Sequence, residues 1–331
     1  MLYWIPGIVL LIIKLGIVLG GLLMAAGWLV YCERRLLGWI QIRLGPNRAG
    51  PFGLLQPVAD ILKLLTKEDL VPAGADRIIF LYAPAIVAAT ALLIFAVVPF
   101  GSTWTLWGKK IPLVISDINV GLLYAFAMSS LGVYGVALGG WASNSKFSLL
   151  GGLRGVAQMI SYELSLGLSL VPVVMLAHSF SLVDIVNAQS KYPFILVQPH
   201  TFLIFFLSAT AEIKRIPFDL PEAENELVAG YHTEYSGMRF GLYFLGEYVT
   251  MVVLGALVAV FFLAGWRGPL LPPIVWFMAK VILVVFVMIW MRATLPRLRY
   301  DQLMQLGWKL LVPAALLNII ITGGIVLLLN T

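Results

Sequence analysis

Hydrophobic residues fall into eight long runs along the chain, and charged and polar residues gather between the runs. A helix needs about 20 apolar residues to cross a hydrocarbon layer of about 30 Å, and the runs reach or approach this length. They lack the alternation of membrane barrel strands, and backbone groups in lipid must be hydrogen-bonded internally. The pattern predicts an all-α polytopic membrane protein with eight transmembrane helices, at about residues 7–31, 78–100, 118–140, 156–178, 199–216, 240–264, 273–292 and 308–329.

A shorter amphipathic pattern follows the first run. Over residues 54–67, leucine, valine and isoleucine recur at helical spacing, with Gln56, Asp60, Lys63 and Lys67 between them. We therefore expect an interfacial amphipathic helix at about 54–67. It lies either along the membrane interface or on the cytoplasmic face of the bundle, and both positions are beside the membrane surface.

Composition agrees with a membrane protein and limits its chemistry. The chain is 61% hydrophobic and only 11% charged, whereas a soluble domain is about 25% charged. One cysteine, Cys32, allows neither an intrachain disulfide nor a cysteine cluster for zinc or iron–sulfur. The sequence also has no glycine-rich nucleotide loop. We expect one membrane domain over residues 1–331, with no metal, flavin or iron–sulfur cluster of its own.

The lysines and arginines predict the orientation. The connections after the first, third, fifth and seventh runs carry 16 of them, and the opposite side carries 4. The positive-inside rule places the basic connections in the cytoplasm, or the equivalent compartment of an organelle, and both termini on the other side. The first run leads into Glu33 rather than a small-residue cleavage site, so we expect it to be retained.

Three charged residues are predicted to lie deep in the membrane. At about 1.5 Å per helical residue, Glu163 lies about 13 Å beyond Arg154, and Glu247 and Lys280 are similarly deep. Each costs roughly 2.5–3.5 kcal/mol to insert, so it needs a partner or a purpose. A structural buried ion pair is one interpretation. We favour a proton path, because burial raises the pKa of a carboxyl group toward neutrality.

The segment EIKRIPFDLPEAENELVAG, residues 212–230, concentrates acid in a cytoplasmic connection that is otherwise basic. A solvated acidic surface is the plain alternative. A calcium site is disfavoured, because the spacing does not match an EF-hand loop and Pro217 and Pro221 interrupt it. His232, just beyond, is a candidate for proton exchange near neutral pH. The segment holds five of the chain's 16 carboxylates: Glu212, Asp219, Glu222, Glu224 and Glu226.

Four motifs occur in order along the chain. They are ERRLLGWIQIRLGPNRAGPFGLLQPVADILKLLTKED, GWASNSKFSLLGGLRG, SYELSLGLSL and EIKRIPFDLPEAENELVAGYHTEYSG. With these motifs the chain resembles the H-subunit family of bacterial respiratory complex I, whose mitochondrial counterpart is NADH dehydrogenase subunit 1. The resemblance covers essentially the whole chain.

The resemblance implies a membrane subunit of the proton-pumping NADH:quinone oxidoreductase, located in the bacterial inner membrane. Such a subunit forms the quinone entrance chamber and couples quinone reduction to proton translocation. Quinone is the substrate, and flavin and iron–sulfur clusters belong to partner subunits. The implied partners are the peripheral quinone-site and terminal-cluster subunits, the antiporter-like and small membrane-arm subunits, and lipid, but not nucleic acid. The chain alone is expected to have no catalytic activity.

The resemblance also assigns residues. The expected quinone chamber and funnel comprise Glu33, Arg34, Arg35, Asp60, Asp219, Glu222, Glu224 and Glu226. The expected buried carboxylates of the proton path are Glu163, Glu212 and Glu247, to which we add Lys280 and His232. Ser129 and Ser130 stand where some family members carry a further buried acid, so a path through that position needs water or another group.

Two other functions are compatible with parts of the pattern. A related membrane-bound hydrogenase, or a complex with another electron donor, would share some of these motifs. A stand-alone ion transporter is the third possibility, but no internal repeat is evident.

Overall fold

The computed structural model describes residues 5–106, 109–222 and 224–330. Within these ranges, seven helical segments are long and apolar enough to cross a membrane. Six of them are single helices, and the seventh combines α12 (Tyr300–Gln305), the π-helical turn η4 (Leu306–Leu311) and α13 (Val312–Asn330). The six are α1 (Ile5–Ile40), α3 (Arg77–Ile94), α4 (Gly121–Ala142), α5 (Lys146–Ala177), α10 (Gly237–Phe262) and α11 (Pro273–Thr294).

The fifth predicted segment forms a shorter helix than expected. α8 (Pro199–Glu212) has 14 residues, fewer than the about 20 that a straight crossing needs. The helix ends at Glu212, before the predicted end of the span at 216, because Lys214 has a left-handed backbone with φ of 62°. Pro217 also disfavours helical geometry at the residue before it. The short helix α7 (Phe194–Val197) precedes α8.

Two helices extend beyond the spans predicted for them, because charged residues do not end a helix. α1 continues to Ile40 instead of ending at 31, so Glu33, Arg34 and Arg35 lie on its last turns. No proline interrupts the chain there before Pro46. α5 begins at Lys146 instead of 156, and its 32 residues span about 48 Å. This length exceeds the hydrocarbon layer of about 30 Å.

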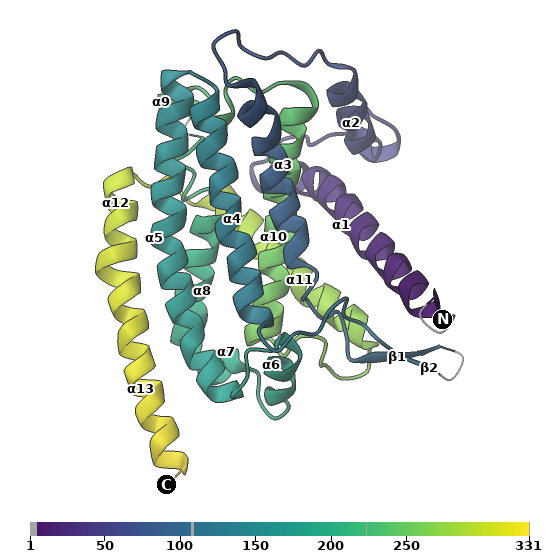
Figure 1. Cartoon of the computed structure of the whole chain (residues 1–331), viewed down its shortest axis with the longest axis vertical. Helices are drawn as coiled ribbons and strands as arrows, with labels where there is room; N and C mark the ends of the chain where they lie inside the picture. Colours follow the sequence, from purple (N-terminus) through teal and green to yellow (C-terminus); the bar gives the residue numbers. More distant parts are fainter. Residues whose placement is uncertain (1–4, 107–108, 223, 331) are drawn as a thin grey trace.

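α10 is the central helix of the bundle. In its most apolar window 72% of the residues are buried, compared with 11% for α1. α3 and α11 pack against α10, α4 packs against α3 and α5, and α8 packs against α5 (Figure 1). α1 and α13 flank opposite sides of this core, and the start of α1 and the end of α13 lie toward the same end of the bundle (Figure 1).

The connections contain the remaining elements. A helix is present near the predicted amphipathic segment: α2 (Gln56–Thr66), after the turn η2 (Pro51–Gly53). The side chains of Val58, Ile61, Leu62 and Leu65 are about half exposed, and the interfacial position of α2 stays a prediction. The acid-rich connection includes α9 (Glu224–Leu227) and the 3-10 turn η3 (Gly230–His232). At the opposite end are α6 (Leu182–Ala188) and a hairpin of β1 (Thr103–Leu106) and β2 (Lys109–Pro112), an unpredicted exception to the all-α pattern.

Candidate functional site

Arg215 is the centre of a buried ion-pair network. Its guanidinium lies 2.5 Å from Glu33 Oε2 and 2.5 Å from Glu247 Oε1. The second oxygen of Glu33 accepts a hydrogen bond from Arg292 Nη1. Glu33 is only 2% exposed, and the Arg215 guanidinium also lies 4.3 Å from the centre of the Tyr248 ring. The network thus joins α1, α10 and α11 to the connection after α8, with two carboxylates opposite two guanidinium groups.

Lys214, beside Arg215, is buried and forms no ion pair with the residues that the structure describes. Its side chain is 8% exposed, and its ammonium group lies 4.6 Å from the centre of the Tyr231 ring. Burial lowers the pKa of Lys214, although Glu222, Glu247 and Asp219 act in the opposite direction. A buried ammonium facing several carboxylates is unusual, and such groups mark functional sites.

Glu222 is the carboxyl group of the acid-rich connection with the largest change in proton affinity. The pKa of Glu222 is raised to about 8, chiefly by burial. The negative charges of Glu247 and Asp219 also raise it, and the positive charges of Lys214 and Arg215 lower it by less. A carboxyl group with this pKa exchanges protons in the physiological range. The connection is therefore not a solvated acidic surface at this position.

Glu212 and Glu163 are held by two adjacent serines of α4. The hydroxyl group of Ser129 donates a hydrogen bond to Glu212 Oε1, and that of Ser130 contacts Glu163 Oε1. Ser130 also lies 3.0 Å from the carbonyl of Phe126, a second acceptor for its single hydroxyl proton. Each of the two carboxyl groups is therefore held by the hydroxyl group of a different serine of α4.

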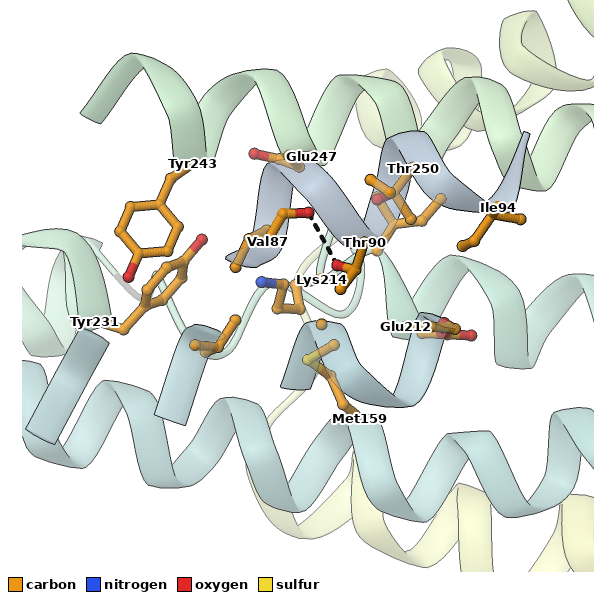
Figure 2. A pocket seen from close by; sticks show the side chains of 15 residues that line it. Val87, Thr90, Ile94, Met159, Glu212, Lys214, Tyr231, Tyr243, Glu247 and Thr250 are labelled. Carbon is orange, nitrogen blue, oxygen red and sulfur yellow. Dashed lines mark hydrogen bonds between the residues drawn. The ribbon is translucent and has the colours of Figure 1, made fainter. Parts of the chain in front are cut away.

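A cavity of about 40 Å³ with a mixed apolar and polar lining lies between α3, α4, α5 and α10. It is larger than the roughly 10–15 Å³ that one water molecule requires. Glu212, Lys214 and Glu247 all line it, together with hydroxyl groups of Ser129, Thr90, Thr250, Tyr231 and Tyr243 (Figure 2). Water in this cavity would have the several polar partners that ordered water needs. The arrangement suits proton exchange between Glu212 and Glu247.

Comparison with known proteins supports the same class of protein. A family model described as NADH dehydrogenase matches residues 13–323. The chain belongs to this family. It is 72% identical over 327 residues to an NADH-quinone oxidoreductase H subunit of Syntrophobacter fumaroxidans, with 99% of each chain covered. It is 64% identical to an H subunit of the same enzyme from Geobacter sulfurreducens, with 95% of each covered, and 52% identical to the one from Thermomicrobium roseum, with 97% and 94% covered. The resemblance to the H-subunit family is thus confirmed.

The residues at the end of α1 that the family resemblance singles out bind the following connection. Arg34 Nη1 lies 2.9 Å from Asp60 Oδ2, which ties α1 to α2. Arg35 donates to the carbonyl of Phe52 at 2.7 Å. Glu33 is part of the buried network, so neighbouring residues of one motif have different environments. The motif fixes α2 and residues 41–55 beside the end of α1.

The acids of the predicted funnel are not all in one place. Glu222 is partly buried, with 24% of its side chain exposed, whereas Glu226 is 61% exposed and lies 2.5 Å from Arg154 Nη1. That hydrogen bond holds the pKa of Glu226 below its usual value. Asp219 is close enough to Lys214 and Glu222 to influence both. The side chain of Glu224 lies outside the described residues.

His232 and Lys280 differ in their relation to this family site. His232 Nδ1 lies 4.0 Å from Glu222 Oε1, and burial and the Lys214 charge lower the pKa of His232 to about 4. Its imidazole is therefore neutral at pH 7. Lys280 Nζ donates to the carbonyls of Leu263, Gly265 and Arg267 at 2.6, 2.8 and 2.6 Å. Leu263 is sixteen residues after Glu247, about 24 Å along α10, so the structure does not bring Lys280 to the carboxylates.

The sequence did not single out Lys214 as a functional candidate. In the sequence, Lys214 is only a second basic residue beside Arg215, and basic residues are common at the cytoplasmic end of a membrane span. Its burial becomes evident once the left-handed turn directs it toward α3 and α10. In the part of the chain that the structure describes, no group of three or more His, Cys, Asp or Glu residues is arranged for a metal ion.

Proposed function

We propose that this chain is the membrane subunit of an NADH:quinone oxidoreductase that forms the quinone entrance chamber and couples quinone reduction to proton translocation. The relatives at 52–72% identity are named as the H subunit of that enzyme over almost their full length. Their name implies further subunits of the complex as partners. Flavin and iron–sulfur clusters in those partners would carry the electrons, and this chain would carry protons and receive the quinone.

The observation that carries the coupling proposal is the continuous line of buried ionisable groups. It runs from the Glu33–Arg215–Glu247 network, through the cavity, to Glu212 and Ser129, with Ser130 and Glu163 beside them. Helices of the bundle core surround this line. A line that reaches so far into an apolar bundle costs free energy, which favours a functional role.

Quinone reduction provides the charge change that such a line could detect. Two electrons added to a quinone require two protons to form the neutral quinol. A unit charge at 4 Å interacts by about 4 kcal/mol at an effective dielectric constant of 20, and 1.36 kcal/mol corresponds to one pKa unit. Reduction near Glu222 and Asp219 would thus change the proton affinity of Glu222, whose charge acts on Lys214 in the same connection.

The chamber is proposed at the end of the bundle that carries α2 and the acid-rich connection. α2 exposes an apolar face, which suits an isoprenoid tail, and the Arg34–Asp60 pair fixes α2 beside α1. Glu33, Arg35, Asp219, Glu222, Glu224 and Glu226 complete the proposed chamber and funnel. The headgroup would then approach the charged network from the side of the partner subunits.

The proposed topology has eight crossings in the bacterial inner membrane. α8 would complete its crossing together with α7, which explains why the start of α1 and the end of α13 lie toward one end of the bundle. By the distribution of lysine and arginine, that end is non-cytoplasmic, and the acid-rich connection faces the cytoplasm.

The assembled complex tests this function. Membranes containing an affinity-tagged form of this chain should yield a large complex with flavin and iron–sulfur clusters that oxidises NADH with a quinone. Glu247→Gln should lower the quinone reductase rate, whereas Glu68→Gln, an exposed carboxylate at the same end, should not. A complex that accepts electrons only from hydrogen or another donor would support the alternative assembly. Ion transport by the chain without partners would support a transporter.

A further inference from the structure

Lys214 is a buried cation. None of the ion pairs found among the described residues includes it. The ion pairs of Glu33, Glu247 and Glu222 are made with Arg215, Arg292 and His232. Arg215, the neighbour of Lys214, is fixed by Glu33 and Glu247 at 2.5 Å each. Lys280, another partly buried lysine, is fixed by three carbonyl groups. The ammonium group of Lys214 instead lies over the face of Tyr231, 4.6 Å from the ring centre.

Titratable groups face Lys214 from several elements. The carboxyl groups are Asp219 and Glu222 of its own connection, Glu212 of α8 and Glu247 of α10. The other groups are the phenols of Tyr231 and Tyr243, the imidazole of His232, and the guanidinium of Arg215. His232 is neutral at pH 7 and Arg215 is permanently charged. The partners available for proton exchange with Lys214 are therefore the four carboxyl groups.

The cavity places Lys214 beside the carboxyl groups of Glu212 and Glu247. The nitrogen of Lys214 points toward Tyr231, and Glu247 and Glu212 line the same cavity (Figure 2). Ion pairing normally keeps a lysine charged, but burial outweighs the nearby carboxylates and lowers its pKa. A lysine amine that is not held in a fixed ion pair can accept one proton and donate it again.

We propose that Lys214 carries protons between the acid-rich connection and the carboxyl groups of the bundle, within the proton path on which the proposed function rests. The ammonium group of Lys214 gives a proton, through water in the cavity, to the carboxylate of Glu212 or Glu247, and Lys214 becomes a neutral amine. The protonated carboxyl group of Glu222 then gives its proton to this amine, so that Lys214 is again an ammonium group and Glu222 is a carboxylate. Charge and protons balance over the two steps.

Two substitutions separate proton transfer from a fixed counterion role. Lys214→Arg retains a positive charge that cannot be released, and Lys214→Met removes the charge but keeps an unbranched side chain. Lys146→Met, at an exposed lysine toward the same end of the bundle, is the matched control. Each variant is measured in the purified complex in proteoliposomes, with complex assembly, NADH:quinone reduction and proton uptake recorded across a range of pH.

Both Lys214 variants should assemble and lose coupled turnover by roughly 10²-fold, the lower end of what a positioned proton-transfer group contributes. The limb of the wild-type pH–rate profile on which Lys214 becomes permanently protonated should be absent from both. Wild-type turnover with an unchanged pH profile in Lys214→Arg would overturn the proposal and make Lys214 a counterion. If Lys214→Arg fails to assemble, Lys214→Met alone decides by its pH profile. A wild-type complex without NADH:quinone activity would instead contradict the proposed function.

Discussion

Glu33→Gln removes the charge that holds two arginines in place. Arg215 and Arg292 each bind one oxygen of Glu33, which is 2% exposed. An amide has one acceptor oxygen, and its nitrogen is a donor, so it would face one of the guanidinium groups donor to donor. Glu247 would remain opposite Arg215, but Arg292 would keep no carboxylate partner among the ion pairs of the described residues.

The magnitude follows from the burial of the network. Removing one partner of a buried ion pair costs about 3–5 kcal/mol, because the remaining charge is left uncompensated. Since 1.4 kcal/mol is tenfold in an equilibrium constant, local opening should become more frequent by on the order of 10²-fold or more. The opening should affect the last turns of α1 and residues 213–218, which the network joins.

Hydrogen exchange in the purified complex measures this opening. Amide protection in these two segments should fall by the stated factor in Glu33→Gln and should be unchanged in Glu68→Gln, with an exposed carboxylate. Glu33→Gln combined with Arg292→Gln should recover part of the protection, because the stranded charge is removed. A change of less than about threefold in the single variant, roughly 0.6 kcal/mol, would refute the view that Glu33 holds the network together.

Three further predictions follow from the site. First, the pKa of Glu222 is raised from 4.5 to about 8, so between these pH values the folded state binds more protons than the unfolded state. The stability that this group contributes is therefore present below pH 4.5 and is lost as the pH rises to about 8. Amide protection of residues 219–235, corrected for intrinsic exchange, should decline with pH in the wild type and should lose this dependence in Glu222→Gln. Second, Ser129→Ala removes a donor to the buried Glu212 and should destabilise the complex by about 1–3 kcal/mol, measured as a lower thermal midpoint, whereas an unchanged midpoint would mean that another donor replaces the serine. Third, a Cβ atom at Gly151 would lie 2.7 Å from the backbone of Gly230 and Tyr231, while one at Gly167 of the same helix meets nothing within 4 Å. Gly151→Ala should therefore lower the thermal midpoint by the equivalent of about 1–3 kcal/mol and disturb Tyr231. Equal midpoints for Gly151→Ala and Gly167→Ala would contradict this packing.

The long helices could be predicted from the sequence because apolar length is a direct consequence of the bilayer. Their ends could not, since Glu33, Arg34 and Arg35 continue α1 as helix formers. α8 was predicted too long because its end depends on the left-handed turn at Lys214, which apolar periodicity does not reveal. The β1–β2 hairpin was missed because its strands have only four residues each.

The buried carboxylates were found from their depth in apolar runs, but their partners were not. Glu33 and Arg215 are 182 residues apart in the chain, and such a contact exists only in the folded bundle. The sequence marked Ser129 and Ser130 only as the position where some family members carry a buried acid. The structure shows that their hydroxyl groups reach Glu212 and Glu163. For Lys280, depth alone did not reveal that the side chain turns to the carbonyls after α10.

Proton translocation per NADH oxidised, measured in proteoliposomes with the purified complex, tests the coupling role most directly. Glu212→Gln should assemble and lower the number of protons translocated per NADH or abolish coupled turnover, because a glutamine at that point cannot accept the proton. Glu68→Gln should keep the wild-type ratio and rate. A wild-type ratio and rate in Glu212→Gln would contradict a proton path through the buried carboxylates of this chain.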